Sequence, residues 1–94
     1  MSYKVTEEGN IATIHLDGEI DMDVTEKAKE VIFPHIEAGK EVHLNLSSVQ
    51  YMDSSGISVL IESKQLAEKN SAKFELTEVS KPVEKVLSMA RKFL

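Results

Sequence analysis

The sequence predicts an α/β fold, a single domain in which a mixed four-stranded sheet carries three helices in the order β-β-α-β-α-β-α. Three observations predict this class. Short segments of strand-like character are separated by turns that contain Gly or Asn. Amphipathic segments with helical spacing follow the second, third and fourth of these strands. Strands separated by helices favour parallel pairing through right-handed crossovers, whereas a tight turn makes an antiparallel pair.

The first two strands are expected to form a hairpin. Residues 3–7 and 11–17 have strand-like character, and the short segment between them contains Gly9. In the second strand Ile14 and Leu16 alternate with polar side chains, so one face of this strand is expected to point into the core.

The first helix is predicted to begin at Asp23, after a loop over residues 18–22, because Glu26 is placed to complete a capping box. Pro34 is expected to kink or end this helix, since proline lacks the backbone N–H, and Gly39 is a natural stop. The apolar stripe of the helix consists of Val24, Ala28, Val31 and Ile32.

A central strand and a second helix are predicted next. The apolar series that predicts the strand is Val42, Leu44, Leu46 and Val49. A tight Asp-Ser-Ser-Gly junction over residues 53–56 leads into a helix over residues 56–68. At about 100° per residue, the core-facing stripe of that helix comprises Gly56, Val59, Leu60, Ser63, Leu66 and Ala67.

Ile57 and Ile61 fall outside this stripe, on the polar side of the second helix and next to the end that carries Ser54. Two interpretations stay open. In the first, Ile57 and Ile61 are isolated side chains that are exposed or covered by another loop. In the second, they belong to a surface that docks a partner beside Ser54. Polar replacements at both positions distinguish the two, because a docking role predicts lost partner binding with an intact fold.

The chain closes with a strand and a helix. Residues 73–77 alternate Phe74 and Leu76 with polar neighbours, which predicts the strand. Ser80 is expected to cap the last helix, with Pro82 in its first turn. The apolar stripe of this helix is Val83, Val86, Leu87, Ala90 and Leu94.

Composition narrows the functional classes. The net charge of the 94 residues is −5 and no basic patch is visible, so no nucleic-acid partner is expected. The absence of cysteine excludes disulfides and thiolate metal sites. No apolar run approaches the roughly 18 residues of a membrane span, and the N-terminus lacks a signal-peptide pattern. A cytoplasmic protein without membrane contact is therefore expected.

Neither a metal nor another cofactor is expected. A metal site needs at least three converging ligands, and His15, His35 and His43 lie on different predicted elements, although His15 and His43 could be neighbours on adjacent strands. The acidic run over residues 17–23 lacks the glycine and the final glutamate of an EF-hand loop, which favours a solvated loop.

Enzymatic activity is not expected either. A catalytic serine needs a base within reach, and the junction around Ser54 contains no histidine or lysine and does not match a nucleophile elbow. The sequence also lacks a glycine-rich phosphate-binding motif. These features favour a binding protein.

Three segments of the sequence resemble one family. Residues 44–65 (LNLSSVQYMDSSGISVLIESKQ) are similar to the signature of the anti-sigma factor antagonists, which are small bacterial STAS-domain proteins. Residues 17–24 (DGEIDMDV) resemble the Gly-Glu-Leu/Ile-Asp element of that family, and residues 79–90 (VSKPVEKVLSMA) resemble its Ser-Pro-x-Val-x-x-x-Leu helix. The resemblance covers nearly the whole chain in order, and it implies that residues 1–94 form one STAS-like domain.

The resemblance implies a phosphorylation switch. Ser54 matches the serine that, in this family, is phosphorylated by an anti-sigma factor that is itself an ATP-using serine kinase. The unphosphorylated protein binds that kinase and so frees a sigma factor. The phosphorylated protein does not bind until a serine phosphatase resets it. Asp21 matches an aspartate whose loop lies beside the phosphoacceptor, and Asp53 precedes the serine in the motif.

The other expected site residues surround Ser54. The neighbours of the switch are Asp21, Asp23, Asp53, Ser55 and Gly56, and the expected partner surface comprises Ile57, Ser58 and Ile61. A phosphate on Ser54 would add about −1.5 to −2 charges, and the N–H groups of the helix could hold it without a change of fold. A partner that approaches a neutral hydroxyl would then meet like charge and steric bulk.

Two alternatives stay open. Ser54 and Ser55 could merely cap the helix, a contribution of about 1 kcal/mol. A STAS domain can also serve as a subunit of a membrane transport complex, or as another interaction module, without any kinase. In the transport type a threonine often occupies the serine position, so the Asp-Ser-Ser-Gly sequence favours the switch.

Overall fold

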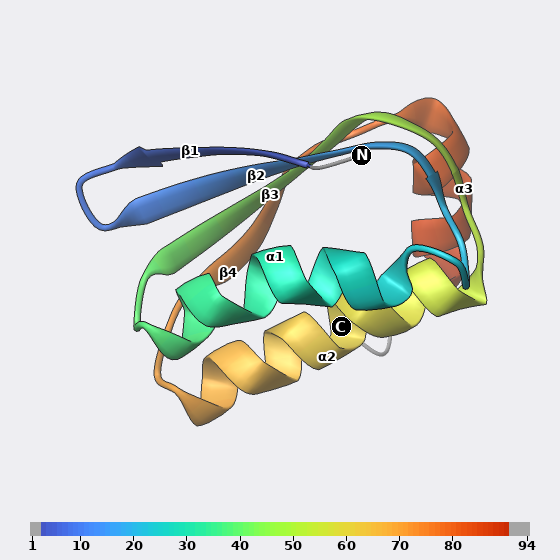
Figure 1. The fold of residues 1–94 in the computed structure, drawn as a ribbon. Coiled ribbons are helices and arrows are strands. Elements are labelled where there is room, and N and C mark those ends of the chain that lie inside the picture. Colours follow the sequence, from blue (N-terminus) through green and yellow to red (C-terminus); the bar gives the residue numbers. More distant parts are fainter. Residues whose placement is uncertain (1–2, 91–94) are drawn as a thin grey trace.

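Residues 3–90, which the computed structural model describes, contain seven elements in the order that the sequence predicts (Figure 1). They are β1 (Lys4–Glu8), β2 (Ile11–Ile20), α1 (Thr25–Glu37), β3 (Glu41–Met52), α2 (Ser54–Lys69), β4 (Phe74–Val79) and α3 (Lys81–Ala90). No helix within this part of the chain is long and apolar enough to cross a membrane.

The four strands form one mixed sheet in the spatial order β1-β2-β3-β4. β1 and β2 are antiparallel and are joined by a tight turn in which Gly9 adopts a φ of +61°. β2, β3 and β4 are parallel, since a helix crosses over between each successive pair. Figure 1 shows α1 and α2 side by side across one face of the sheet, with α3 near the start of α2. The predicted α/β class and sheet are confirmed.

The core lies between the sheet and the helices α1 and α2, and strand alternation decides which side chains enter it. The fully buried side chains of β2 and β3 include Ala12, Ile14, Leu16, Val42, Leu44 and Leu46. The helices supply Ala28, Ile32, Ile36, Val59, Leu60 and Ala67. The intervening strand residues, such as Thr13 and His43, stand opposite one another on the other face of the sheet, which α1 and α2 leave open.

β2 is longer than predicted, which shortens the loop before α1. Residues 18–20 were expected in a loop, but they continue the strand because Gly18 and Ile20 pair with Val49 and Met52 of β3. Register shifts along this pair allow the strand to continue past the point where its alternation breaks. Pairing with the long β3 outweighs the weak strand propensity of this segment.

The predicted capping box of Asp23 and Glu26 is wrong. α1 begins at Thr25, and its N-cap, Val24, makes no side-chain hydrogen bond. The carboxylate of Asp21 instead accepts the backbone N–H of Asp23 at 3.0 Å. This local bond closes a turn ahead of the helix, so the helix starts two residues later than predicted.

Pro34 lies inside α1 and does not end it, since the helix continues to Glu37. Proline removes one N–H donor from the helix. Ile32 and Ile36, on either side of it, are fully buried, so packing against the sheet offsets the lost hydrogen bond. The predicted stop is confirmed, because Gly39 follows the helix with a φ of +81°.

The connection from β4 to α3 ties that helix to β3. Ser80 donates its backbone N–H to the carbonyl of Leu46 at 3.3 Å and its hydroxyl to the carbonyl of Val49 at 2.6 Å. Ser80 precedes α3 and Pro82 lies in the first turn, as predicted. Ser80 occupies the N-cap position of α3, because its carbonyl accepts the backbone N–H of Glu84 at 2.9 Å, while its hydroxyl donates to β3.

The apolar stripe predicted for α3 is the face that enters the core. Val83 and Leu87 are fully buried and Val86 packs against the cluster at its edge. The side chains of Ala90 and Leu94, which the pattern also places in this stripe, lie outside the described residues.

Candidate functional site

The junction between β3 and α2 is capped by Asp53. Its Oδ1 accepts the backbone N–H of Ser55 at 2.9 Å and that of Gly56 at 3.4 Å. α2 therefore begins at Ser54, two residues earlier than predicted. The interpretation that Ser54 and Ser55 cap the helix is wrong, because the carboxylate before them already takes two of the N–H groups that a helix start leaves unpaired.

Ser54 is the first residue of α2, and its side chain is exposed. Its hydroxyl has no hydrogen-bond partner within residues 3–90, while its backbone carbonyl accepts the hydroxyl of Ser58 at 3.0 Å. Ser55, by contrast, is half-buried. The junction therefore presents one open, unpaired hydroxyl at the N-terminus of a helix.

The loop that carries Asp21 leaves the sheet next to this junction. Ile20 ends β2 opposite Met52 at the end of β3, and the backbone N–H of Asp53 reaches the carbonyl of Ile20 at 3.4 Å. Because the two strands are parallel, the residues that follow them leave from the same edge of the sheet. Asp21 and Ser54 therefore both follow strands that end at the same edge of the sheet.

Gly56 allows this edge to close. A Cβ on Gly56 would lie 2.5 Å from Cγ of Met52 and 2.9 Å from the carbonyl oxygen of Ile20. Only glycine fits where α2 begins beneath the ends of β2 and β3. The glycine of the junction is thus a packing requirement, separate from the chemistry of the serine.

The expected partner surface on α2 needs correction at Ile57. Its side chain is only 8% exposed and belongs to the same buried cluster as Val83 and Leu87 of α3. Ile61 is half-buried and packs against that cluster, whereas Ser58 is exposed. The helical wheel placed Ile57 outside the core because a wheel considers only the side of α2 that faces the sheet. It does not account for α3, which packs near the start of α2 and shares a buried cluster with Ile57.

Two exposed apolar side chains near the junction were missed by the sequence reasoning. Met22, which lies between Asp21 and Asp23, is 76% exposed, and Tyr51, two residues before Asp53, is 50% exposed. An apolar residue inside a strand or loop is normally taken as a core residue, so periodicity alone does not reveal them.

The edge of the sheet around Ser54 carries three carboxylates without a paired cation in the described chain. Among the ion pairs of residues 3–90, none joins Asp21, Asp23 or Asp53 to a lysine or arginine. Burial raises the pKa of the Tyr3 phenol, and the nearby charges of Asp17 and Asp21 raise this pKa further. Within residues 3–90, no lysine or arginine is paired with these carboxylates, so none is in place there to neutralise a further negative charge.

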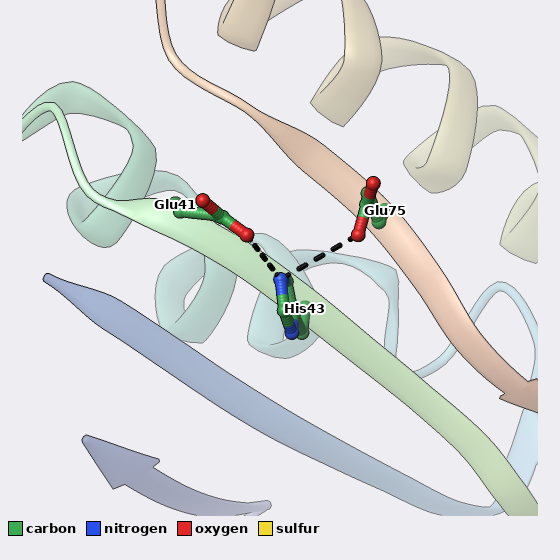
Figure 2. Close-up of side chains that lie close together, drawn as sticks. All are labelled: Glu41, His43 and Glu75. Atoms are coloured by element: carbon green, nitrogen blue, oxygen red, sulfur yellow. Dashed lines mark hydrogen bonds and ion pairs between the residues drawn. The ribbon is translucent and has the colours of Figure 1, made fainter. Parts of the chain in front are cut away.

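A second cluster lies on the open face of the sheet, where His43 contacts Glu41 and Glu75 (Figure 2). His15 lies on the adjacent strand and on the same face, but diagonally from His43, because His15 pairs with Asn45 while His43 pairs with Thr13; the cluster of potential ligands comprises Glu41, His43 and Glu75. The sequence carried a signal for the cluster: alternation puts Glu41 and His43, two residues apart on a strand, on one face.

Comparison with known proteins establishes the family. A family model described as the STAS domain matches residues 2–93, and the chain therefore belongs to the STAS domain family. An anti-sigma-B factor antagonist from Bacillus subtilis (strain 168) is 27% identical over 80 residues, which span 85% of this chain and 73% of that protein.

Solved structures show the same fold. The anti-sigma factor antagonist SpoIIAA in its unphosphorylated form has a TM-score of 0.81 at 22% identity, over 96% of this chain and 81% of SpoIIAA. The Bacillus cell fate determinant SpoIIAA in its phosphorylated form has a TM-score of 0.76 at 22% identity, over 95% of this chain and 83% of that one.

Proposed function

We propose that this STAS domain is an anti-sigma factor antagonist whose binding of an anti-sigma factor is switched by phosphorylation of Ser54. The observation that carries the proposal is the exposed hydroxyl of Ser54, which has no hydrogen-bond partner within residues 3–90. A kinase can reach such a hydroxyl without unfolding the domain, and its modification breaks no internal contact.

A phosphate at Ser54 would act as a surface charge. Asp53 already accepts the N–H groups of Ser55 and Gly56, so these donors are not free to draw the phosphate inward. The added charge of about −1.5 to −2 would stand among carboxylates that no lysine or arginine pairs with in the described chain. The fold is expected to persist, while a partner meets repulsion at this point.

The docking surface in this proposal is the edge around Ser54. It comprises Ser58 on the next turn of α2 and the exposed side chains of Met22, Asp23 and Tyr51. Ile61 contributes at most its exposed portion. Ile57 is left out because its side chain stabilises the core.

The proposed partner is an anti-sigma factor that is an ATP-using serine kinase, with a serine phosphatase to reverse the modification. Two comparisons support this: the Bacillus subtilis relative is an anti-sigma-B factor antagonist, and the related fold of SpoIIAA exists in unphosphorylated and phosphorylated forms. The role proposed for the chain itself is binding, without catalysis.

The test is a pull-down with a candidate anti-sigma factor kinase, together with phosphate mapping after incubation with ATP and Mg²⁺. Wild type and Ser54→Ala are expected to bind, Ser54→Asp is expected to lose binding by at least tenfold, and the label is expected on Ser54 only. Ser71→Asp is the matched control, since it adds the same charge to an exposed serine at the opposite end of α2.

Labelling that persists in Ser54→Ala would overturn the assignment. Equal binding by wild type and Ser54→Asp would overturn the switch and favour a STAS module that works without phosphorylation, such as a transport-complex subunit.

A further inference from the structure

Three potential metal ligands converge on the face of the sheet that α1 and α2 do not cover. Glu41 and His43 project from β3 and Glu75 projects from the neighbouring β4, directly opposite His43 (Figure 2). One ligand atom of each lies within 4.8 Å of those of the other two. Nε2 of His43 is 2.6 Å from Oε2 of Glu41 and 3.6 Å from Oε2 of Glu75.

This cluster has more acceptors than its single donor can serve. A ring nitrogen carries at most one hydrogen, so Nε2 of His43 cannot bond well to both carboxylates. Neither Glu41 nor Glu75 forms an ion pair with a lysine or arginine within residues 3–90. Two carboxylates and one imidazole therefore face a common point, and no lysine or arginine of the described chain balances the carboxylates.

We propose that Glu41, His43 and Glu75 bind a divalent transition-metal ion, for which Zn²⁺ is the best match. Imidazole nitrogen and carboxylate oxygen bind Zn²⁺ at about 2.0–2.2 Å, which puts the ligand atoms of a tetrahedral site about 3.4 Å apart. The two contacts of Nε2, at 2.6 and 3.6 Å, bracket this spacing, and a carboxylate oxygen of Glu41 lies within 4.8 Å of one of Glu75, so side-chain rotations would complete the site. Three protein ligands leave the fourth position to water.

The imidazole and one carboxylate are already held in place. The side chains of His43 and Glu41 are 22% and 29% exposed, so the sheet surface restricts their rotamers, while Glu75 at 62% is free to swing onto the ion. Because β4 pairs only with β3, a bound ion would join this edge strand to its one neighbour.

The site is independent of the proposed switch. Glu41 and His43 begin β3, whereas Ser54 follows the far end of that strand after Met52. Loss of metal binding would therefore leave phosphorylation untouched, and failure of the switch would leave the metal site standing.

Calorimetric titration of the full chain with ZnCl₂ at pH 7.5, in a buffer that does not chelate, tests the proposal. Wild type is expected to bind one ion per chain, His43→Ala to lose at least tenfold in affinity, and Glu75→Gln to lose several-fold. His15→Ala is the matched control, because it removes another imidazole of the same sheet face, on β2. Affinity is expected to fall as the pH is lowered, since protons compete for the imidazole.

Thermal unfolding gives a second readout that does not depend on His43 alone. Zn²⁺ is expected to raise the Tm of wild type and His15→Ala by a few degrees and to leave that of Glu75→Gln nearly unchanged. Glu75 is exposed, so this variant is expected to fold. The proposal is wrong if wild type fails to saturate below 1 mM Zn²⁺, if His43→Ala binds within twofold of wild type, or if His15→Ala loses as much affinity.

Discussion

The carbonyl oxygen of Ile20 lies 2.9 Å from the position that a Cβ on Gly56 would occupy. The last residue of β2 and the third residue of α2 thus approach too closely to admit a side chain on Gly56, although they are far apart in the sequence. This contact brings the loop of Asp21 to the start of α2. The stability of the domain and the shape of the site therefore depend on the same glycine.

Gly56→Ala is expected to destabilise the domain by about 1–3 kcal/mol, because the new methyl group would overlap Met52 and the carbonyl of Ile20. Urea unfolding measures the loss. Ser58→Ala is the control, as an exposed position of the same helix, and is expected to change the free energy of unfolding by less than about 0.5 kcal/mol. Equal stability of Gly56→Ala and wild type would contradict the close contact.

Asp53→Ala is expected to cost about 1 kcal/mol of unfolding free energy, because Ser55 and Gly56 lose the carboxylate that accepts their N–H groups. Asp53→Asn is expected to retain most of the stabilisation that the cap provides, since an amide oxygen accepts the same hydrogen bonds. Ser54→Ala is expected to be nearly neutral. A loss in Ser54→Ala as large as that in Asp53→Ala would mean that the serine caps the helix after all.

Ile57→Ala is expected to lower the free energy of unfolding by about 2–5 kcal/mol, as a buried large-to-small replacement does. Ile61→Ala, at a half-buried position one turn later, is expected to lose clearly less and serves as the matched comparison. Chemical denaturation of both variants measures these losses. If Ile57→Ala left the free energy of unfolding unchanged, Ile57 would again be a candidate for the partner surface.

Stability at alkaline pH is expected to depend on Tyr3. Burial and the charges of Asp17 and Asp21 raise the pKa of its phenol in the folded state above the value of about 10 in the unfolded chain. Folding thus favours the neutral phenol, and this contribution is fully present below pH 10 and lost as the pH rises through the folded-state pKa.

Unfolding by urea at pH 8 and pH 11 measures this effect. Tyr3→Phe is expected to lose less stability than wild type between the two values, because it has no phenol to ionise. Tyr51→Phe, which removes a half-exposed phenol, is the control. If the free energy of unfolding fell equally in Tyr3→Phe and wild type between pH 8 and pH 11, Tyr3 would not be the cause of the alkaline loss of stability.

Hydrophobic periodicity in the sequence was enough to predict the element order, the mixed sheet and the buried stripes. Ile14 and Leu16 on β2, or Val83 and Leu87 on α3, enter the core because alternation and helical spacing are local properties of the backbone. The Asp-Ser-Ser-Gly junction was also readable, since its residue types are those that begin a helix.

The partner of each polar group was decided by the folded chain. Asp53 rather than Ser54 caps α2, and Asp21 bonds Asp23 ahead of α1, both through local hydrogen bonds. The hydroxyl of Ser80 bonds the carbonyl of Val49 on the distant strand β3. The register of β3 against β4 likewise put Glu75 beside His43. Local pattern determines which face of an element is apolar, but only packing determines what each face meets.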